Sequence, residues 1–260
     1  MSRVQSDYEP HVLASRDLLK NDPVLSELLD PNVSPLFLEC FLVEWLARTP
    51  YMTAPAASWI RRAGKRCIDQ GIKRVGHALV AHAVCDEAAL DLTTRNLRTI
   101  VRLMNTRYGA RIDIDALLTM PPTVTMRAYR ILHEEVIAAD ISVGEVAIAY
   151  EIERARSLFD MTVLVAVQRA LGPETTLALS ALRRSAPLAI EHTVFFERAL
   201  AEILEHKPDC NEQLAEIGAG VLDIYRYFLR ECVEAAKERA RSMSVPSSRR
   251  GPKQVPSLYV

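Results

Sequence analysis

The stretch IKRVGHALVAHAVCDEAALDLTTRNLRTIVRLMNTRYG, residues 72–109, decides the fold class. Between Val75 and Leu92 it is apolar or small almost all round, which is typical of a helix enclosed by other helices. The polar residues that interrupt this segment are His82, Asp86, Glu87 and Asp91. The sequence therefore predicts a central helix that carries imidazole and carboxylate groups into the protein interior.

Helical spacing decides which of these groups share a face. His82 and Asp86 are four residues apart, as are Glu87 and Asp91, so each pair can meet on one side of the helix. A buried carboxylate is costly unless it is paired, protonated or bound to a metal. Two explanations stay open: a structural network that fixes helix packing, or a functional site.

Apolar residues recur at three- and four-residue spacing along most of the chain, and no segment alternates with the period of a strand. We expect helices over residues 8–20, 34–47, 54–70, 72–106, 121–138, 142–171, 174–206 and 211–242. The fold class is therefore all-α, as a single compact bundle of about seven to eight helices.

Prolines and glycines mark the ends of these helices. Thr53 with Pro55 suits a helix start, and Pro121–Pro122 cannot continue a preceding helix. The glycines that suit helix ends are Gly71, Gly109 and Gly172. One domain is expected over residues 1–242, followed by a flexible basic and proline-containing tail over 243–260.

Bulk composition excludes several classes of partner. Lys and Arg number 32 against 33 Asp and Glu, so the formal net charge of -1 gives no electrostatic footprint for nucleic acid. The 5 cysteines are far apart in the sequence and form no C-x-x-C pair. The N-terminal residues lack the apolar core of a signal peptide, and no segment of the sequence is apolar enough to span a membrane. We expect a cytoplasmic protein with neither nucleic acid nor membrane as partner.

Two later segments also place polar residues among apolar neighbours. In VGEVAIAYEIERARSLF, Glu151 is predicted to be buried, whereas Glu153 is predicted at the solvated edge of the helix. In LAIEHTVFFERAL, His192 shares a face with Phe195 and Phe196 and should point inward, although a core histidine satisfied by hydrogen bonds is an open alternative. Facing helices that contribute Glu and His can build an iron, manganese or zinc site.

The order of five segments resembles the haem-oxygenase-like superfamily: EWLARTPYM, HAVCDEAALD, VAIAYEIE, LAIEHTVFFERALAEIL and VLDIYRYFLREC. The likeness spans residues 36–236 and is to the iron-containing redox branch related to TENA-type thiaminases. It implies a haem-oxygenase-like bundle with a di-iron pair that activates dioxygen. Carried onto this chain, Glu87 or Asp86 would be the first carboxylate ligand, Glu151 the bridging one and His192 the last histidine.

The chain departs from that ligand pattern. Ser185 and Ala189 stand where the third motif has His and Asp, and Leu90 or Thr94 stands where the central helix would offer its histidine. Neither serine nor alanine can replace an anionic ligand. The Glu, Asp and His residues that remain as candidate ligands could bind one metal ion more easily than two. The alternative is a protein that binds no metal.

These observations predict an oxidoreductase of specialised small-molecule metabolism that binds an amine- or acid-bearing substrate between the central helices. The predicted metal ligands are Glu87, Asp91, Glu151 and His192, and the predicted substrate-binding residues are Tyr150, Arg154 and Glu191. The predicted catalytic residues are Glu87, Glu151 and, as the acid–base group if metal is absent, His82.

A second hypothesis is a metal-free member of the same family, either a cofactor-independent enzyme or a non-catalytic protein that binds a small molecule. The small residues in TAPAASWIRRAG permit close helix contact within one chain or between two. A homodimer is therefore left open.

Overall fold

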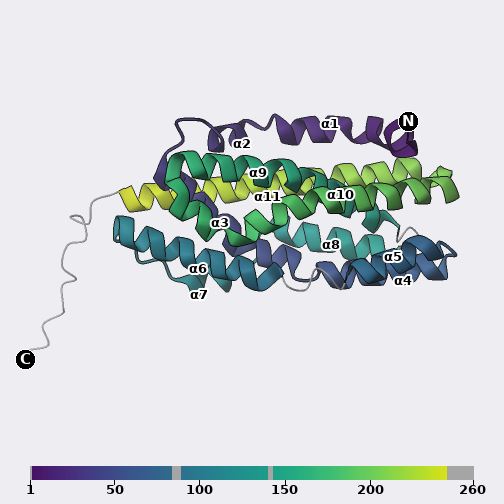
Figure 1. Ribbon diagram of the computed structural model, residues 1–260, viewed down its shortest axis with the longest axis horizontal. Helices are drawn as coiled ribbons and strands as arrows, with labels where there is room; N and C mark the ends of the chain where they lie inside the picture. The colour runs from purple at the N-terminus through teal and green to yellow at the C-terminus, as the bar shows by residue number, and fades with distance from the viewer. Residues whose placement is uncertain (1, 84–88, 140–142, 245–260) are drawn as a thin grey trace, which may run out of the picture.

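The computed structural model describes residues 2–83, 89–139 and 143–244, with the side chains of residues 89–91 excepted, and every regular element in those ranges is helical. This confirms the predicted all-α class. The elements are η1 (Val4–Tyr8), α1 (Glu9–Lys20), α2 (Pro23–Leu28), α3 (Pro35–Thr53), α4 (Ala56–Asp69), α5 (Lys73–His82), α6 (Ala89–Tyr108), α7 (Ile114–Leu118), α8 (Val124–Ala138), α9 (Gly144–Ala178), α10 (Ser180–His206), η3 (Pro208–Cys210) and α11 (Asn211–Ser244) (Figure 1).

Most predicted helix ends are confirmed. Gly71, Gly109 and Gly172 have φ angles of 86°, 62° and 80°, the left-handed region that glycine adopts without steric cost. Gly172 interrupts α9 near its end. The predicted cap at Thr53 is wrong, because α3 continues through Thr53, whose hydroxyl donates to the Thr49 carbonyl at 3.1 Å.

The helix enclosed on all sides is α3, and the described start of the predicted segment from Val75 to Leu92 lies in α5, which has an exposed face, whereas residues 84–88 and the side chains of 89–91 lie outside the described residues. Every residue of α3 from Phe37 to Arg48 is buried. In contrast, α5 ends at His82 and exposes Lys73, Arg74 and His77 on one face. The expected continuous helix over 72–106 is wrong at its first break, because α5 ends at His82; residues 84–88 lie outside the described residues, and α6 begins at Ala89.

Burial of α3 requires that its two acidic residues be neutralised. Glu39 pairs with Arg107 of α6. Glu44 pairs with Arg48 one turn later and accepts from Nε of Arg239 of α11 at 2.7 Å. These ion pairs hold α3 between α6 and α11, since an unpaired buried carboxylate would be strongly destabilising.

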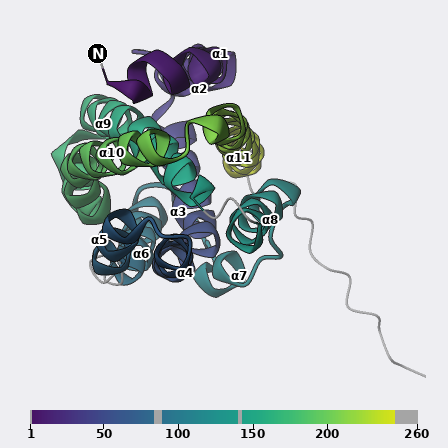
Figure 2. The same cartoon turned by 90° about the vertical axis from the view of Figure 1, so that its right-hand side faces the viewer.

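The remaining helices surround α3 (Figure 2). Helix α9 packs along α10 and α11, while α1 lies outside them against α11. On the opposite side of the bundle, α4 and α5 pack closely: a Cβ added at Gly76 would lie 2.5 Å from the Gly64 carbonyl oxygen. The small residues around Gly64 thus serve a contact within the chain. Among the described residues, no helix has the length and apolarity needed to span a membrane.

Candidate functional site

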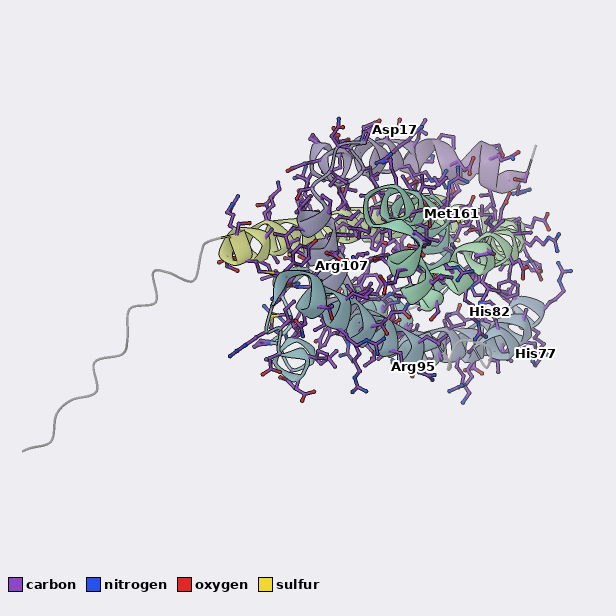
Figure 3. All side chains as sticks on the ribbon, turned by 60° about the vertical axis from the view of Figure 1, so that its left-hand side comes forward. Asp17, His77, His82, Arg95, Arg107 and Met161 are labelled. Atoms are coloured by element: carbon purple, nitrogen blue, oxygen red, sulfur yellow. The ribbon has the colours of Figure 1, made fainter. Side chains whose placement is uncertain are left out.

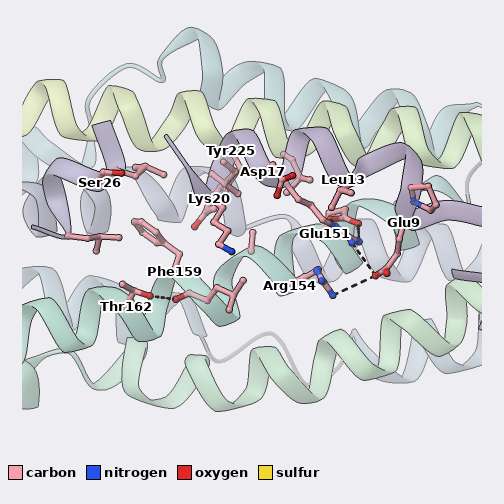
Figure 4. Close-up of a pocket in the computed structure, with 18 of the residues that line it drawn as sticks. Glu9, Leu13, Asp17, Lys20, Ser26, Glu151, Arg154, Phe159, Thr162 and Tyr225 are labelled. Atoms are coloured by element: carbon pink, nitrogen blue, oxygen red, sulfur yellow. Dashed lines mark hydrogen bonds and ion pairs between the residues drawn. The ribbon is translucent and has the colours of Figure 1, made fainter. Parts of the chain in front are cut away.

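Two pockets lie on different sides of α9, and three predicted site residues line them: Glu151 and Arg154 line one, and His192 lines the other. The outer pocket, about 660 Å³, lies between α1–α2 and the face of α9 and α11 that these helices cover (Figure 4). The interior pocket, about 340 Å³, lies between α3, α6, α8, α9, α10 and α11. Both volumes fall in the range of pockets that bind small organic molecules.

Glu151 lies at the wall of the outer pocket with its side chain fully buried. The predicted burial is confirmed, and an ion pair with Arg16 of α1 offsets the cost of removing the carboxylate from water. Arg16 donates from Nε to Oε2 at 2.9 Å and from Nη2 to Oε1 at 2.7 Å, which is a bidentate pair. Both carboxylate oxygens of Glu151 are therefore engaged in holding α1 on the bundle.

The neighbours of Glu151 extend this network along α1. The Tyr150 hydroxyl donates to Glu9 at 3.1 Å, and burial raises the pKa of this phenol to about 12. Glu9 also accepts from Arg16 at 3.1 Å, and Arg154 lies 3.7 Å from it. Arg154 lines the outer pocket with its side chain 42% exposed (Figure 4). Of the predicted substrate-binding residues, Arg154 is thus placed at a pocket, whereas Tyr150 binds Glu9.

The interior pocket has an apolar, aromatic floor and an open rim. Buried side chains of Trp45, Tyr129, Tyr225 and Phe228 line the floor. The exposed lining residues are Thr53, Arg184 and Leu188. A ligand in this pocket would place its body against aromatic rings and one end near solvent.

Asp160 of α9 is the carboxylate of the interior pocket, and its side chain is 1% exposed. The Ser185 hydroxyl lies 3.5 Å from Oδ2, and Nε of Arg156 lies 3.7 Å from the same oxygen. Oδ1 is buried and accepts no hydrogen bond from the residues that the structure describes. Burial raises the pKa of Asp160 to about 6, although the charge of Arg156 acts in the opposite direction.

A second polar group lies beside Asp160 on the same face of α9. Arg156 donates to Glu153 at 3.1 Å, and Nδ1 of His192 lies 3.8 Å from Glu153. Burial opposes ionisation of Glu153, but the charge of Arg156 and the contact with His192 hold its pKa below the usual value. The prediction that Glu153 lies at a solvated edge is wrong, because its side chain is only 15% exposed and turns toward α10.

The predicted histidines lie together. The His82 ring stacks on Phe195 at 4.5 Å between ring centroids and meets His192 edge-on at 4.6 Å. His192 lines the interior pocket, whereas His82 lies on the α5 side of the bundle, far from Asp17 of α1 (Figure 3). The inward position predicted for His192 is confirmed.

The described members of the predicted metal site are not brought together. Two residues along a helix turn the direction by about 200°, so Glu151 and the Glu153–His192 contact lie on opposite sides of α9. Glu191, a predicted substrate-binding residue, is exposed and lines neither of the two pockets. Glu87, like the side chain of Asp91, lies outside the described residues.

An iron ion does not fit the donors that the structure describes. Both oxygens of Glu151 already bind Arg16, and His192 points to Glu153 instead of toward Glu151. Within residues 2–83, 92–139 and 143–244, no three His, Cys, Asp or Glu side chains form a cluster that could hold a metal. Ser185, at a position where the resemblance implies a ligand, lies instead against Asp160.

Sequence reasoning missed Asp160 and Arg156, although a signal was present. In RSLFDMTVLVAV, Asp160 is a charged residue within an apolar segment, as Glu151 is in its own segment. Arg156 lies four residues before Asp160 and therefore on the same face of the helix. It also missed the buried pair of His133 and Glu145, whose atoms Nδ1 and Oε2 lie 2.8 Å apart. Neither residue of that pair lines either pocket.

Comparison with known proteins reveals the fold. No family model matches the chain, and no curated protein sequence does. The structure is similar to the crystal structure of a domain of unknown function with a haem-oxygenase-like fold from Shewanella denitrificans OS217, with a TM-score of 0.69 and 16% identity, covering 94% of this chain and 96% of that one. The thiaminase-related branch and its iron stay predictions. The chain has the haem-oxygenase-like fold.

Proposed function

We propose that the interior pocket binds a small amine-bearing molecule and that Asp160 exchanges a proton with the amine. The observation that carries this proposal is that Asp160 belongs to the pocket lining and that its buried oxygen Oδ1 has no hydrogen-bond donor among the described residues. A ligand ammonium supplies both the missing donor and the opposite charge. Giving one proton to the carboxylate leaves a neutral amine beside a carboxylic acid, and the reverse transfer restores both ions.

The charges around Asp160 favour a cationic ligand. Arg156 lies nearer to Glu153, at 3.1 Å, than to Asp160, at 3.7 Å, so its charge is shared between two carboxylates. When the negative charge of a buried carboxylate is only partly balanced by a neighbouring cation, the carboxylate attracts a second cation. The aromatic rings of Trp45 and Tyr129 in the pocket lining add attraction for a positive charge.

The pKa of Asp160 suits proton transfer. At about 6 it lies close to neutral pH, where a carboxylate is ionised enough to accept a proton and acidic enough to return it. Perturbed groups of this kind in a pocket are typical of functional sites. The proposal thus follows the metal-free alternative, as a cofactor-independent enzyme acting on an amine.

The iron-dependent oxidoreductase implied by the resemblance receives less support. It would use Glu151 and His192 as ligands of one centre, yet these residues contact different neighbours on opposite sides of α9. No step of the proposal therefore passes through a metal.

Isothermal titration calorimetry with hexylamine tests the proposal. Wild-type protein should bind one hexylamine per chain, and Asp160→Asn should weaken binding by about tenfold or more, since it removes the charge that the ammonium faces. Asp17→Asn is the matched control, because Asp17 is an exposed carboxylate that lines the outer pocket. Equal affinity in wild type and Asp160→Asn, or an effect as large in Asp17→Asn, would contradict the proposal.

A further inference from the structure

We infer that the ligand of the interior pocket carries an anionic group at the end opposite its amine, and that Arg184 binds this group at the rim. The inference rests on the proposed function, since it takes Asp160 as the partner of the amine. It assigns the ligand to the class of ω-amino acids, molecules with an ammonium at one end and a carboxylate at the other.

The charges of the pocket are arranged from floor to rim. Asp160 lies on the buried floor with its side chain 1% exposed, while Arg184 is exposed at the opening. Arg156, the other arginine of the lining, is engaged by Glu153 and Asp160. One carboxylate inside and one guanidinium outside therefore face a ligand that enters the pocket.

Helix α9 carries Asp160 at one end of this arrangement, and α10 carries Arg184 at the other. Ser185 contacts Asp160, and Arg184 is the residue next to it in the chain. Consecutive helical residues point about 100° apart, so one reaches the floor while the other stands at the opening. The separation of the two charges is thereby set by the packing of α9, which carries Asp160, against α10, which carries Arg184, and a fixed separation is what selection of a ligand by length requires.

Arg184 is also available for an anion. Among the residues that the structure describes it forms no ion pair, unlike Arg16, Arg107 and Arg239, which hold buried carboxylates. A guanidinium presents planar paired donors that match a carboxylate. The adjacent Arg183 is exposed as well but does not line the pocket. Arg183 is therefore a control residue with the same charge as Arg184 but outside the pocket lining.

Competitive calorimetry tests this inference with hexylamine and a length series of 4-aminobutanoate, 6-aminohexanoate and 8-aminooctanoate. At least one amino acid should bind wild type about tenfold more tightly than hexylamine, because it gains a charge-assisted hydrogen-bond pair at Arg184. This advantage should persist in Arg183→Ala and vanish in Arg184→Ala, while the affinity for hexylamine stays unchanged in both variants.

A charge reversal provides the second test. Arg184→Glu should bind 1,6-diaminohexane more tightly than wild type does, because the rim then offers a carboxylate to the second ammonium. If hexylamine binds through Asp160 but no amino acid is favoured, or if the advantage survives in Arg184→Ala, the inference fails and the proposed function stands. If none of the probes binds in an Asp160-dependent manner, the proposed function fails, and this inference with it.

Discussion

Replacing Glu151 by glutamine should loosen α1 from the bundle. The substitution keeps the size of the side chain but removes the charge that faces Arg16, whose side chain is only 12% exposed. Arg16 would then be left as a largely buried cation, with Glu9 at 3.1 Å as its remaining carboxylate partner.

The expected cost follows from the burial of both partners. Removing one member of a buried ion pair costs about 3–5 kcal/mol, because the other charge stays desolvated. For a chain of this length that corresponds to a fall in Tm of roughly 6–20 °C. Detachment of α1 alone limits the loss in global stability, since a helix that leaves the bundle returns Arg16 to water.

Hydrogen exchange of the α1 amides is therefore the most direct assay. Protection in α1 should fall in Glu151→Gln, whereas protection in α3 should change little. Arg154→Gln is the control, since Arg154 is 42% exposed and lies 3.7 Å from Glu9, a pair expected to contribute below about 1 kcal/mol.

The double variant Arg16→Met with Glu151→Leu completes the test. Replacing both charges by apolar groups of similar size should recover most of the lost stability. The explanation of Glu151 as the partner that holds α1 is refuted if Glu151→Gln leaves α1 protection at the wild-type level. In that case a ligand role for Glu151 would regain support.

Two further predictions concern the interior pocket and the packing of α4 on α5. The folded-state pKa of Asp160, about 6, lies above its usual value of 3.8, so ionisation of Asp160 disfavours the fold as pH rises through that range. The stability of Asp160→Asn relative to wild type should therefore increase by roughly 2 kcal/mol between pH 4 and pH 8 in urea unfolding, and a pH-independent difference would show that Asp160 is not perturbed. Gly76→Ala should cost about 1–3 kcal/mol in the same assay, because the added carbon meets the Gly64 carbonyl oxygen at 2.5 Å. Gly220→Ala, which meets no atom within 4 Å, should instead be neutral or stabilising by about 0.5–1 kcal/mol, and similar effects at both glycines would contradict the close helix contact.

Features set by local sequence could be predicted. Helix ends at Gly71, Gly109 and Gly172 follow from a backbone conformation that glycine adopts without steric cost. The burial of Glu151 follows from its apolar neighbours on every side. Both inferences need no knowledge of distant residues.

Features set by distant partners could not be predicted. The sequence around Glu151 suggested a metal ligand. In the structure Glu151 forms an ion pair with Arg16, which lies 135 residues earlier in the chain. The enclosure of α3 does not follow from its own sequence, because Glu39 and Glu44 are charged residues among its apolar ones. Their partners Arg107 and Arg239 lie 68 and 195 residues away.

The environment of Asp160 could be predicted only in part. Its apolar context in the sequence indicates burial, but the orientation of its unsatisfied oxygen depends on how Ser185 and Arg156 surround it. Only tertiary structure separates a carboxylate whose oxygens are both paired, as in Glu151, from one that has a buried oxygen without a donor among the described residues, as in Asp160.

A crystal structure of the protein with hexylamine tests the central claim most directly. The amine nitrogen should lie in the interior pocket within hydrogen-bond distance of Asp160, about 2.7–3.2 Å, with the alkyl chain against the aromatic floor. Hexylamine in the outer pocket alone, or in the interior pocket with its nitrogen turned away from Asp160, would contradict the account.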